Sequence, residues 1–289
     1  EYRVDVHLKE PVQHILSRDE AVCAVVTERN TYAVDAVILC TGGKSYPRTG
    51  STGDGYTLAR ELGHKVTTLR PVLIPFVTEE SWCRELQGLS LRNVNLSVSA
   101  GRKAEAMGEM MFTHFGITGP IVLSLSDSVS LWLSRGYAVT AELDMKPALD
   151  QEKLDRRVLR DLEKYHLKQM AGALQDLLPH RMVDVVLSLA GIPRDLPVAE
   201  LTKGQRQSLV YTLKHMKLTI SGTRPIEEAI VTGGGISVKE INSSTMESKI
   251  CRNLYFAGEV LDVDAYTGGF NLQIAFSTAA CAADAIGSL

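Results

Sequence analysis

The last forty residues of the chain hold the residue types best suited to cofactor chemistry. An apolar run over 253–257 ends in Gly258-Glu259, and a loop then leads through Gly268-Gly269 to a small-residue helix predicted over 275–286. A helix N-terminus presents free backbone N–H groups and a positive dipole end, which favour an anion or an electron-rich ring. Glycines let a ligand approach the backbone closely. The pattern predicts a nucleotide-cofactor site at this helix start.

Two earlier stretches have a related form. A buried strand predicted over 32–41 ends in Thr41 and runs into Gly42 and Gly43. After a polar loop, Thr-Gly-Asp-Gly over 52–55 opens a helix predicted to reach Leu62, with Asp54 as the expected N-cap. Backbone beside such glycines can lie against a nucleotide, although a strand followed by a tight turn needs no ligand. Both interpretations stay open at this point.

The elements that must position these residues predict an α/β fold. Strand patterns occupy 2–8, 12–16 and 21–27 before the Thr-Gly-Gly turn, and short strands recur between 89 and 145. Residues 150–217 have a helical period that prolines and a glycine break into three or four helices. Strand patterns return at 218–220 and 229–232. We expect the strands over 32–41 and 253–259 to pair, because both run into glycine-bearing loops.

This layout predicts a nested domain organisation. A discontinuous Rossmann-like domain comprises residues 1–70 and 251–289. A β-rich, barrel-like domain is inserted at 71–149 and returns at 218–250, and a small helical subdomain, 150–217, is inserted within it.

Composition limits the classes of partner. The 289 residues are 45% hydrophobic, with 31 basic and 34 acidic residues and a net charge of −3. No basic block is present, so we expect no nucleic-acid partner. No apolar run approaches the roughly 20 residues that span a membrane, so we expect no membrane association. Five scattered cysteines without zinc spacing indicate a reducing, cytoplasmic setting and no structural metal.

Four stretches together give the chain a resemblance to a known family. They are 40–56, 111–120, 230–239 and 256–273, and they span nearly the whole sequence. The chain resembles the bacterial FAD-dependent oxidoreductases of the BaiN/YhiN-like group, which includes aminoacetone-oxidase-like flavoproteins. The resemblance implies that the discontinuous domain is an FAD-binding domain and that NAD(P)H is a possible electron donor.

The resemblance also implies which residues bind the cofactor. Either Glu259 or Asp262 takes the acidic role after the last strand, and the next helix points its N-terminus at the flavin. No catalytic residue and no metal ligand is assigned. The cofactor-binding candidates are Thr41, Gly42, Gly43, Gly258, Glu259, Asp262, Gly268, Gly269, Phe270, Asn271 and Leu272.

One departure from the family pattern concerns the ADP end of the cofactor. The family opens with a strand, a G-x-G-x-x-G turn and a helix, and no such turn occurs here. Gly233-Gly-Gly235 follows a strand but lacks the spacing and the helix. The resemblance implies that about a hundred leading residues of the family pattern are absent, which leaves weaker FAD contacts and an unpaired sheet edge.

Three functions remain open from the sequence. The first is hydride transfer between NAD(P)H, flavin and a small organic substrate. The second is an amine oxidase that passes electrons to oxygen, and the third is a non-catalytic fragment or interaction module. His114 could donate to a substrate carbonyl or be structural. Lys44, Tyr46 and Arg48 could line the site or be ordinary loop residues. The substrate and the oligomeric state are not fixed by the sequence.

Overall fold

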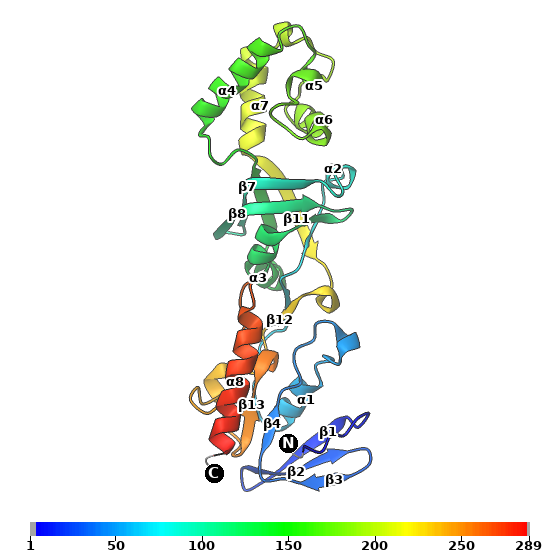
Figure 1. The fold of residues 1–289 in the computed structure, drawn as a ribbon, viewed down its shortest axis with the longest axis vertical. Helices are drawn as coiled ribbons and strands as arrows, with labels where there is room; N and C mark the ends of the chain where they lie inside the picture. Colours follow the sequence, from blue (N-terminus) through cyan, green and yellow to red (C-terminus); the bar gives the residue numbers. More distant parts are fainter. Residues whose placement is uncertain (1–3, 288–289) are drawn as a thin grey trace. The chain divides into compact units, whose positions relative to one another are not determined.

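The computed structural model describes residues 4–287, which divide into two compact units (Figure 1). Unit 1 comprises the chain up to Val72 together with Pro225–Leu289, and unit 2 comprises Leu73–Arg224. The mixed α/β class with a barrel is confirmed. The predicted return segment 218–250 is divided between the units, since β11 (Met216–Thr223) belongs to the barrel and the residues from Pro225 onward pack within unit 1.

The described residues of unit 1 form short strands and two α-helices. Three of its strands form an antiparallel sheet in the order β1-β2-β3, and two-stranded sheets pair β12 with β5 and β13 with β4. Its elements are β1 (Val12–Arg18), β2 (Ala21–Thr27), β3 (Thr31–Ala33), β4 (Val37–Leu39), α1 (Asp54–Glu61), β5 (Arg70–Val72), β12 (Val231–Gly233), β13 (Leu254–Phe256) and α8 (Phe270–Ile286), with 3-10 turns at Pro47–Thr49, Ile226–Glu228, Val238–Glu240 and Gly258–Val260.

Unit 2 is built on a closed barrel of six strands in the order β10-β11-β6-β9-β8-β7. Alternate side chains of its strands, such as Leu96, Val98 and Leu143, point into a buried core, and α3 packs against β8. Its elements are β6 (Phe76–Thr78), α2 (Trp82–Glu85), β7 (Ser90–Ser99), β8 (Lys103–Phe112), β9 (Gly116–Thr118), α3 (Pro120–Ser134), β10 (Val139–Asp144), α4 (Gln151–Lys164), α5 (Met170–Ala173), α6 (His180–Leu189), a 3-10 turn at Val198–Glu200, α7 (Lys203–Lys214) and β11.

The helical segment of unit 2 follows the predicted pattern. Four helices, α4 to α7, occupy the stretch for which three or four were expected. Asp150 caps α4 by accepting the Lys153 N–H at 2.7 Å. Thr202 and Gln205 form a capping box at the start of α7. Pro120 stands at the first position of α3, where proline is favoured because its missing N–H would have no partner in the helix.

Four expectations about local structure in unit 1 are wrong. Residues 4–8 form no strand, and Tyr2 lies outside the described residues. The strand expected over 32–41 is divided into β3 and β4, because β3 pairs antiparallel with β2 while β4 pairs with β13. Gly53, rather than Asp54, is the N-cap of α1. Helix α8 begins at Phe270, five residues before the predicted start.

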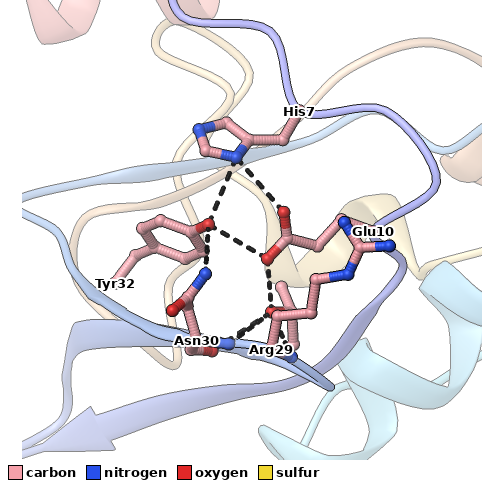
Figure 2. Close-up of polar contacts among 6 residues, drawn as sticks. His7, Glu10, Arg29, Asn30 and Tyr32 are labelled. Carbon is pink, nitrogen blue, oxygen red and sulfur yellow. Dashed lines mark hydrogen bonds and ion pairs between the residues drawn. The ribbon is translucent and has the colours of Figure 1, made fainter.

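A polar network replaces the strand that was expected before β1 (Figure 2). The carboxylate of Glu10 accepts hydrogen bonds from the hydroxyls of Thr27 at 2.7 Å and Tyr32 at 3.0 Å, and it lies 3.2 Å from Nδ1 of His7. These bonds, that of Thr27 foremost, lower the pKa of Glu10. The leading segment is therefore held to the β2–β3 turn by side chains rather than by a strand ladder.

A buried histidine joins the end of α1 to the segment that precedes β13. His64 lies 3.1 Å from the Glu240 carboxylate through Nδ1 and 2.8 Å from the Ser248 hydroxyl through Nε2. Its ring also packs edge-on against Phe256, with centroids 4.9 Å apart. A neutral ring satisfies both neighbours, with Nδ1–H donating to Glu240 and Nε2 accepting from Ser248. Burial lowers the pKa of His64, although Glu240 opposes the shift.

We expect His64 to make folding sensitive to mild acid. Because its pKa is lower in the folded than in the unfolded chain, the unfolded chain binds the extra proton first as pH falls below about 6.5. Stability is therefore full above that pH and declines through the folded pKa. Urea unfolding of the wild type and of His64→Gln between pH 7.5 and about 5 measures this. An identical pH slope in both proteins contradicts the assignment.

Candidate active site

The carboxyl ends of two parallel strands meet at the candidate site. Strand β4 pairs with β13 in the register Val37 to Leu254 and Leu39 to Phe256, so the predicted pairing is confirmed. Beyond these ends lie the Thr-Gly-Gly turn, 41–43, and the 3-10 turn that contains Gly258 and Glu259. In open α/β sheets, ligands bind outside the carboxyl ends of the strands.

Thr232 joins these two turns in what we term the Thr232 cluster: Gly43, Lys44, Ser45, Thr232 and Glu259. The fully buried Thr232 hydroxyl accepts the N–H groups of Lys44 at 2.8 Å and Ser45 at 3.1 Å, and it shares a 2.7 Å bond with the Ser45 hydroxyl. The Thr232 N–H donates to Oε1 of Glu259 at 2.8 Å. One side chain and its own amide thus connect three segments that are distant in sequence.

Gly43 packs closely against the side chains of Thr232 and Glu259. A Cβ at this position would lie 2.4 Å from the Thr232 hydroxyl and 2.5 Å from the Glu259 carboxylate. Gly42 has a φ of +75°, which disfavours other residues. The two glycines are therefore explained by the Thr232 cluster and by turn geometry, whether or not a nucleotide also approaches them.

The Thr41 hydroxyl is a buried polar group at this site whose hydrogen-bonding capacity is not satisfied within the described residues. Its hydroxyl oxygen is buried and has no hydrogen-bond partner among the described residues. Helix α1 begins tightly against it, because a Cβ on Gly55 would lie 2.0 Å from that oxygen. Buried polar groups in folded proteins are nearly always satisfied, so this hydroxyl is available to an added group.

Tyr56 is a site residue that the sequence analysis missed. Its side chain is buried, and its hydroxyl lies 3.5 Å from the Glu259 carbonyl oxygen. Burial, then the charges of Glu259 and Asp262, raise the pKa of Tyr56 far above its ordinary value, so the phenol keeps its proton. Tyr56 directly follows the predicted Thr-Gly-Asp-Gly motif, which is the signal that could have found it.

The acidic residues after β13 have different environments. Glu259 directs its carboxylate inward to Thr232. Asp262 is half-buried, and its N–H donates to the Ile236 carbonyl at 2.9 Å. Asp264 forms an ion pair with the half-buried Arg70, with Nη2 and Oδ2 3.6 Å apart. Glu259 is therefore bonded to Thr232 through its side chain, whereas the bond described for Asp262 is made by its backbone.

The start of α8 has the features expected of a ring-binding helix end. Gly269 is the N-cap with a φ of +91°, and no side chain caps the first turn. Asn271 accepts the Ala265 N–H at 2.9 Å and donates to the Ala265 carbonyl at 2.8 Å, which closes the preceding loop. Gly268, Phe270 and Leu272 are exposed around it. The uncapped N–H groups fit an anionic or electron-rich group.

Gly258 connects this helix to the Thr232 cluster. Its N–H donates to the Thr278 hydroxyl at 2.9 Å, and a Cβ at Gly258 would lie 3.6 Å from that of Ala275. Gly269 is six residues before Ala275, about 9 Å along the helix at the usual rise per residue. The predicted residues therefore form two neighbouring groups, one at the strand ends and one at the helix start.

The remaining candidates have different environments. His114 is exposed in unit 2, where its ring packs edge-on against Phe115. Tyr46 is exposed with a φ of +49°, and Arg48 lies in an exposed 3-10 turn. Lys44 takes part in the Thr232 cluster through its backbone N–H. Within residues 4–287, no helix has the length and apolar character needed to cross a membrane.

Comparisons with known proteins agree with the resemblance. The family model described as the HI0933-like protein Rossmann domain matches residues 1–285. A ribosomal RNA dihydrouridine synthase of Haemophilus influenzae is 34% identical over 97% of this chain and 68% of its own length. The corresponding protein of Escherichia coli is 32% identical over 94% of this chain and 66% of its own length.

A more distant relative has a different named substrate. A 3-dehydro-bile acid delta(4,6)-reductase of Clostridium scindens is 30% identical over 86% of this chain. That match covers 61% of the relative, so the chain spans about two thirds or less of the length of the curated relatives.

We expect Gly43→Ala to destabilise the chain by about 2 kcal/mol or more, because its Cβ would overlap two buried oxygens. Gly204→Ala is the matched control, since no atom lies within 4 Å of its Cβ position in α7. It should be neutral or slightly stabilising. Urea unfolding of both variants measures the difference, and equal stabilities would show that the Thr232 cluster can move aside.

Proposed function

The chain belongs to the HI0933-like Rossmann-domain family, and we propose that it provides the flavin-ring side of the site of an FAD-dependent oxidoreductase. The proposal rests chiefly on one observation, namely that the uncapped start of α8 follows the carboxyl end of β13. When bound, the flavin supplies hydride transfer between a nicotinamide and a substrate.

The residues of this chain fit such a group at two places. At the start of α8, backbone N–H groups would stabilise negative charge on an electron-rich ring, and Asn271 keeps the loop before them in place. At the strand ends, the buried Thr41 hydroxyl has no partner among residues 4–287 and is free to bond to a ligand. The Thr232 cluster holds the backbone between these places.

The acid and the phenol next to the site are both held by contacts within unit 1. Glu259 is committed to the Thr232 N–H, and the Tyr56 phenol remains neutral because its pKa is raised. These two groups help to hold the turn after β13 in place.

The names of the relatives suggest a class of substrate. Formation of dihydrouridine and the action of a delta(4,6)-reductase on a 3-dehydro-bile acid both saturate a carbon–carbon double bond conjugated to a carbonyl group. We extend the proposal to reduction of such a bond, with NAD(P)H as the electron source. The predicted absence of a nucleic-acid partner stays a prediction, since the relatives include proteins named for ribosomal RNA.

Flavin titration tests the cofactor assignment. We expect FAD to bind with a change in its absorption or fluorescence, and Asn271→Ala to weaken binding about tenfold by releasing the loop before α8. Asn242→Ala is the matched control, because the side-chain oxygen of Asn242 accepts the Ser244 N–H within an exposed turn. Equal affinities in both variants, or no flavin binding by the wild type, would refute the assignment.

Substrate tests separate the named chemistries. With FAD and NADPH present, we expect oxidation of NADPH when a 3-oxo-4,6-diene steroid or a uridine-containing ribosomal RNA is added. Mass spectrometry should then find a product heavier by two hydrogens for each reduced double bond. Hydrogen peroxide release with an amine and without NADPH would instead identify the oxidase that the sequence left open.

A further inference from the structure

Helix α4 of unit 2 has a buried apolar face and an exposed basic face. Leu154, Val158 and Leu162 are buried in the core of the unit, and α4 lies beside α7 (Figure 1). Positions 153, 156, 160 and 164 follow one another at intervals of three or four, so they share the opposite face of the helix. All four residues are basic and exposed. We call them the α4 stripe: Lys153, Arg156, Arg160 and Lys164.

The arginines of the stripe keep their positive charge available. Asp155 and Asp161 belong to the same helix, but each binds an arginine outside the stripe at 2.8 Å. Arg156 and Arg160 form no ion pair with any carboxylate among residues 4–287, including Glu152, which stands four positions before Arg156. The lysines at the two ends of the stripe pair with exposed carboxylates, and such pairs in water contribute little.

An apolar pocket opens beside the stripe. Its volume is about 220 Å³, and most of its lining is aliphatic, with Glu163 and His166 among the polar members. Arg156 precedes Leu159 by three positions and Arg160 precedes Glu163 by three, so the stripe follows the α4 side of the pocket. We call this cavity the α4 pocket; its lining residues are Leu159, Leu162, Glu163, His166, Val198, Ala199, Leu201 and Arg206.

A basic stripe next to an apolar pocket suits single-stranded nucleic acid. The stripe is about 16 Å long at the usual rise per residue, so it can follow several phosphates of one strand. Unpaired bases stack on side chains such as histidine and are hydrogen-bonded at their edges. Nδ1 of His166 donates to the Glu163 carbonyl at 3.1 Å, which holds the ring beside the pocket. The Glu163 carboxylate offers an acceptor to the N–H groups of a base.

The other polyanions that bind basic helices fit this surface less well. A helix that lies on an anionic membrane inserts its apolar face, whereas the apolar face of α4 is already buried within unit 2. A regular RNA duplex presents no unpaired base to a pocket. RNA is the nucleic acid in the names of two relatives, the ribosomal RNA dihydrouridine synthases.

We propose that the α4 stripe and the α4 pocket bind single-stranded RNA, with phosphates on the arginines and one unpaired base in the pocket. The choice of RNA rests on the proposed function, in which a uridine-containing ribosomal RNA is one substrate. The proposal departs from the expectation of no nucleic-acid partner, which was based on the absence of a contiguous basic block. Helical spacing brings together on one face charges that are separated in the sequence.

RNA binding by the full 289-residue chain tests the stripe. The probe is a short, fluorescein-labelled, uridine-containing single strand, followed by anisotropy without flavin or NADPH. We expect the double variant Arg156→Gln, Arg160→Gln to weaken binding at least about tenfold. The slope of log Kd against log salt should also fall by about 1.4, because each phosphate contact to a single strand contributes about 0.7.

A charge-matched variant separates a specific surface from general attraction. Arg102→Gln with Arg135→Gln removes two exposed arginines of unit 2 outside α4 and should leave affinity and slope unchanged. Equal losses in the two double variants, or unchanged binding in the first, overturn the proposal. The assay contains no flavin and the flavin titration contains no RNA, so each proposal can fail while the other stands.

Filling the pocket tests the site for a base. Ala199 is exposed at its edge, so Ala199→Trp should block the pocket without changing any charge. We expect RNA binding to weaken at least about fivefold with an unchanged salt slope, and circular dichroism checks that the variant folds. Unchanged affinity in this variant, equally tight binding of a duplex, or tighter binding to phosphatidylserine vesicles than to RNA would contradict the proposed occupant.

Discussion

The hydroxyl of Thr232 is the group on which the arrangement at the strand ends depends. It accepts two backbone N–H groups from the turn after β4, and the amide of the same residue binds the Glu259 carboxylate after β13. All these groups are at least partly removed from water, where an unmade hydrogen bond is costly. Gly43 follows as a requirement, because any side chain there would displace the Thr232 hydroxyl. Contacts within the protein therefore hold in place the backbone that would face a ligand.

The sequence predicted the parts of this arrangement that depend on local pattern. The hydrophobic strands over 37–39 and 254–256, the glycine turns after them and the helices over 150–217 all have short-range signals. The parallel pairing of β4 with β13 was also expected, because both strands end in glycine-bearing loops. The family resemblance, carried by four separate stretches, is confirmed by the match to residues 1–285.

The parts that the sequence did not predict depend on contacts between distant residues. Thr232 stands in a Val-Thr-Gly-Gly-Gly stretch that lacks the phosphate-loop spacing, and nothing local indicates that its hydroxyl binds Lys44 and Ser45. The early start of α8 has a similar cause, since Asn271 stabilises the first turn by bonding back to Ala265. Residues 4–8 have the alternating pattern of a strand but do not form one. No strand among the described residues pairs with this segment.

The two units differ in how completely they satisfy their own strands. The barrel of unit 2 closes on itself, and closure removes sheet edges. Unit 1 has a two-stranded parallel sheet of β4 and β13, and an apolar groove beside β4 is lined in part by Thr41. The Thr41 hydroxyl is also the buried group that lacks a hydrogen-bond partner within residues 4–287, so the groove and the candidate cofactor site share a residue. A ligand that bonds to this hydroxyl would satisfy a buried polar group and would hold the segment that lines the groove, so order in the groove and ligand binding would favour each other thermodynamically.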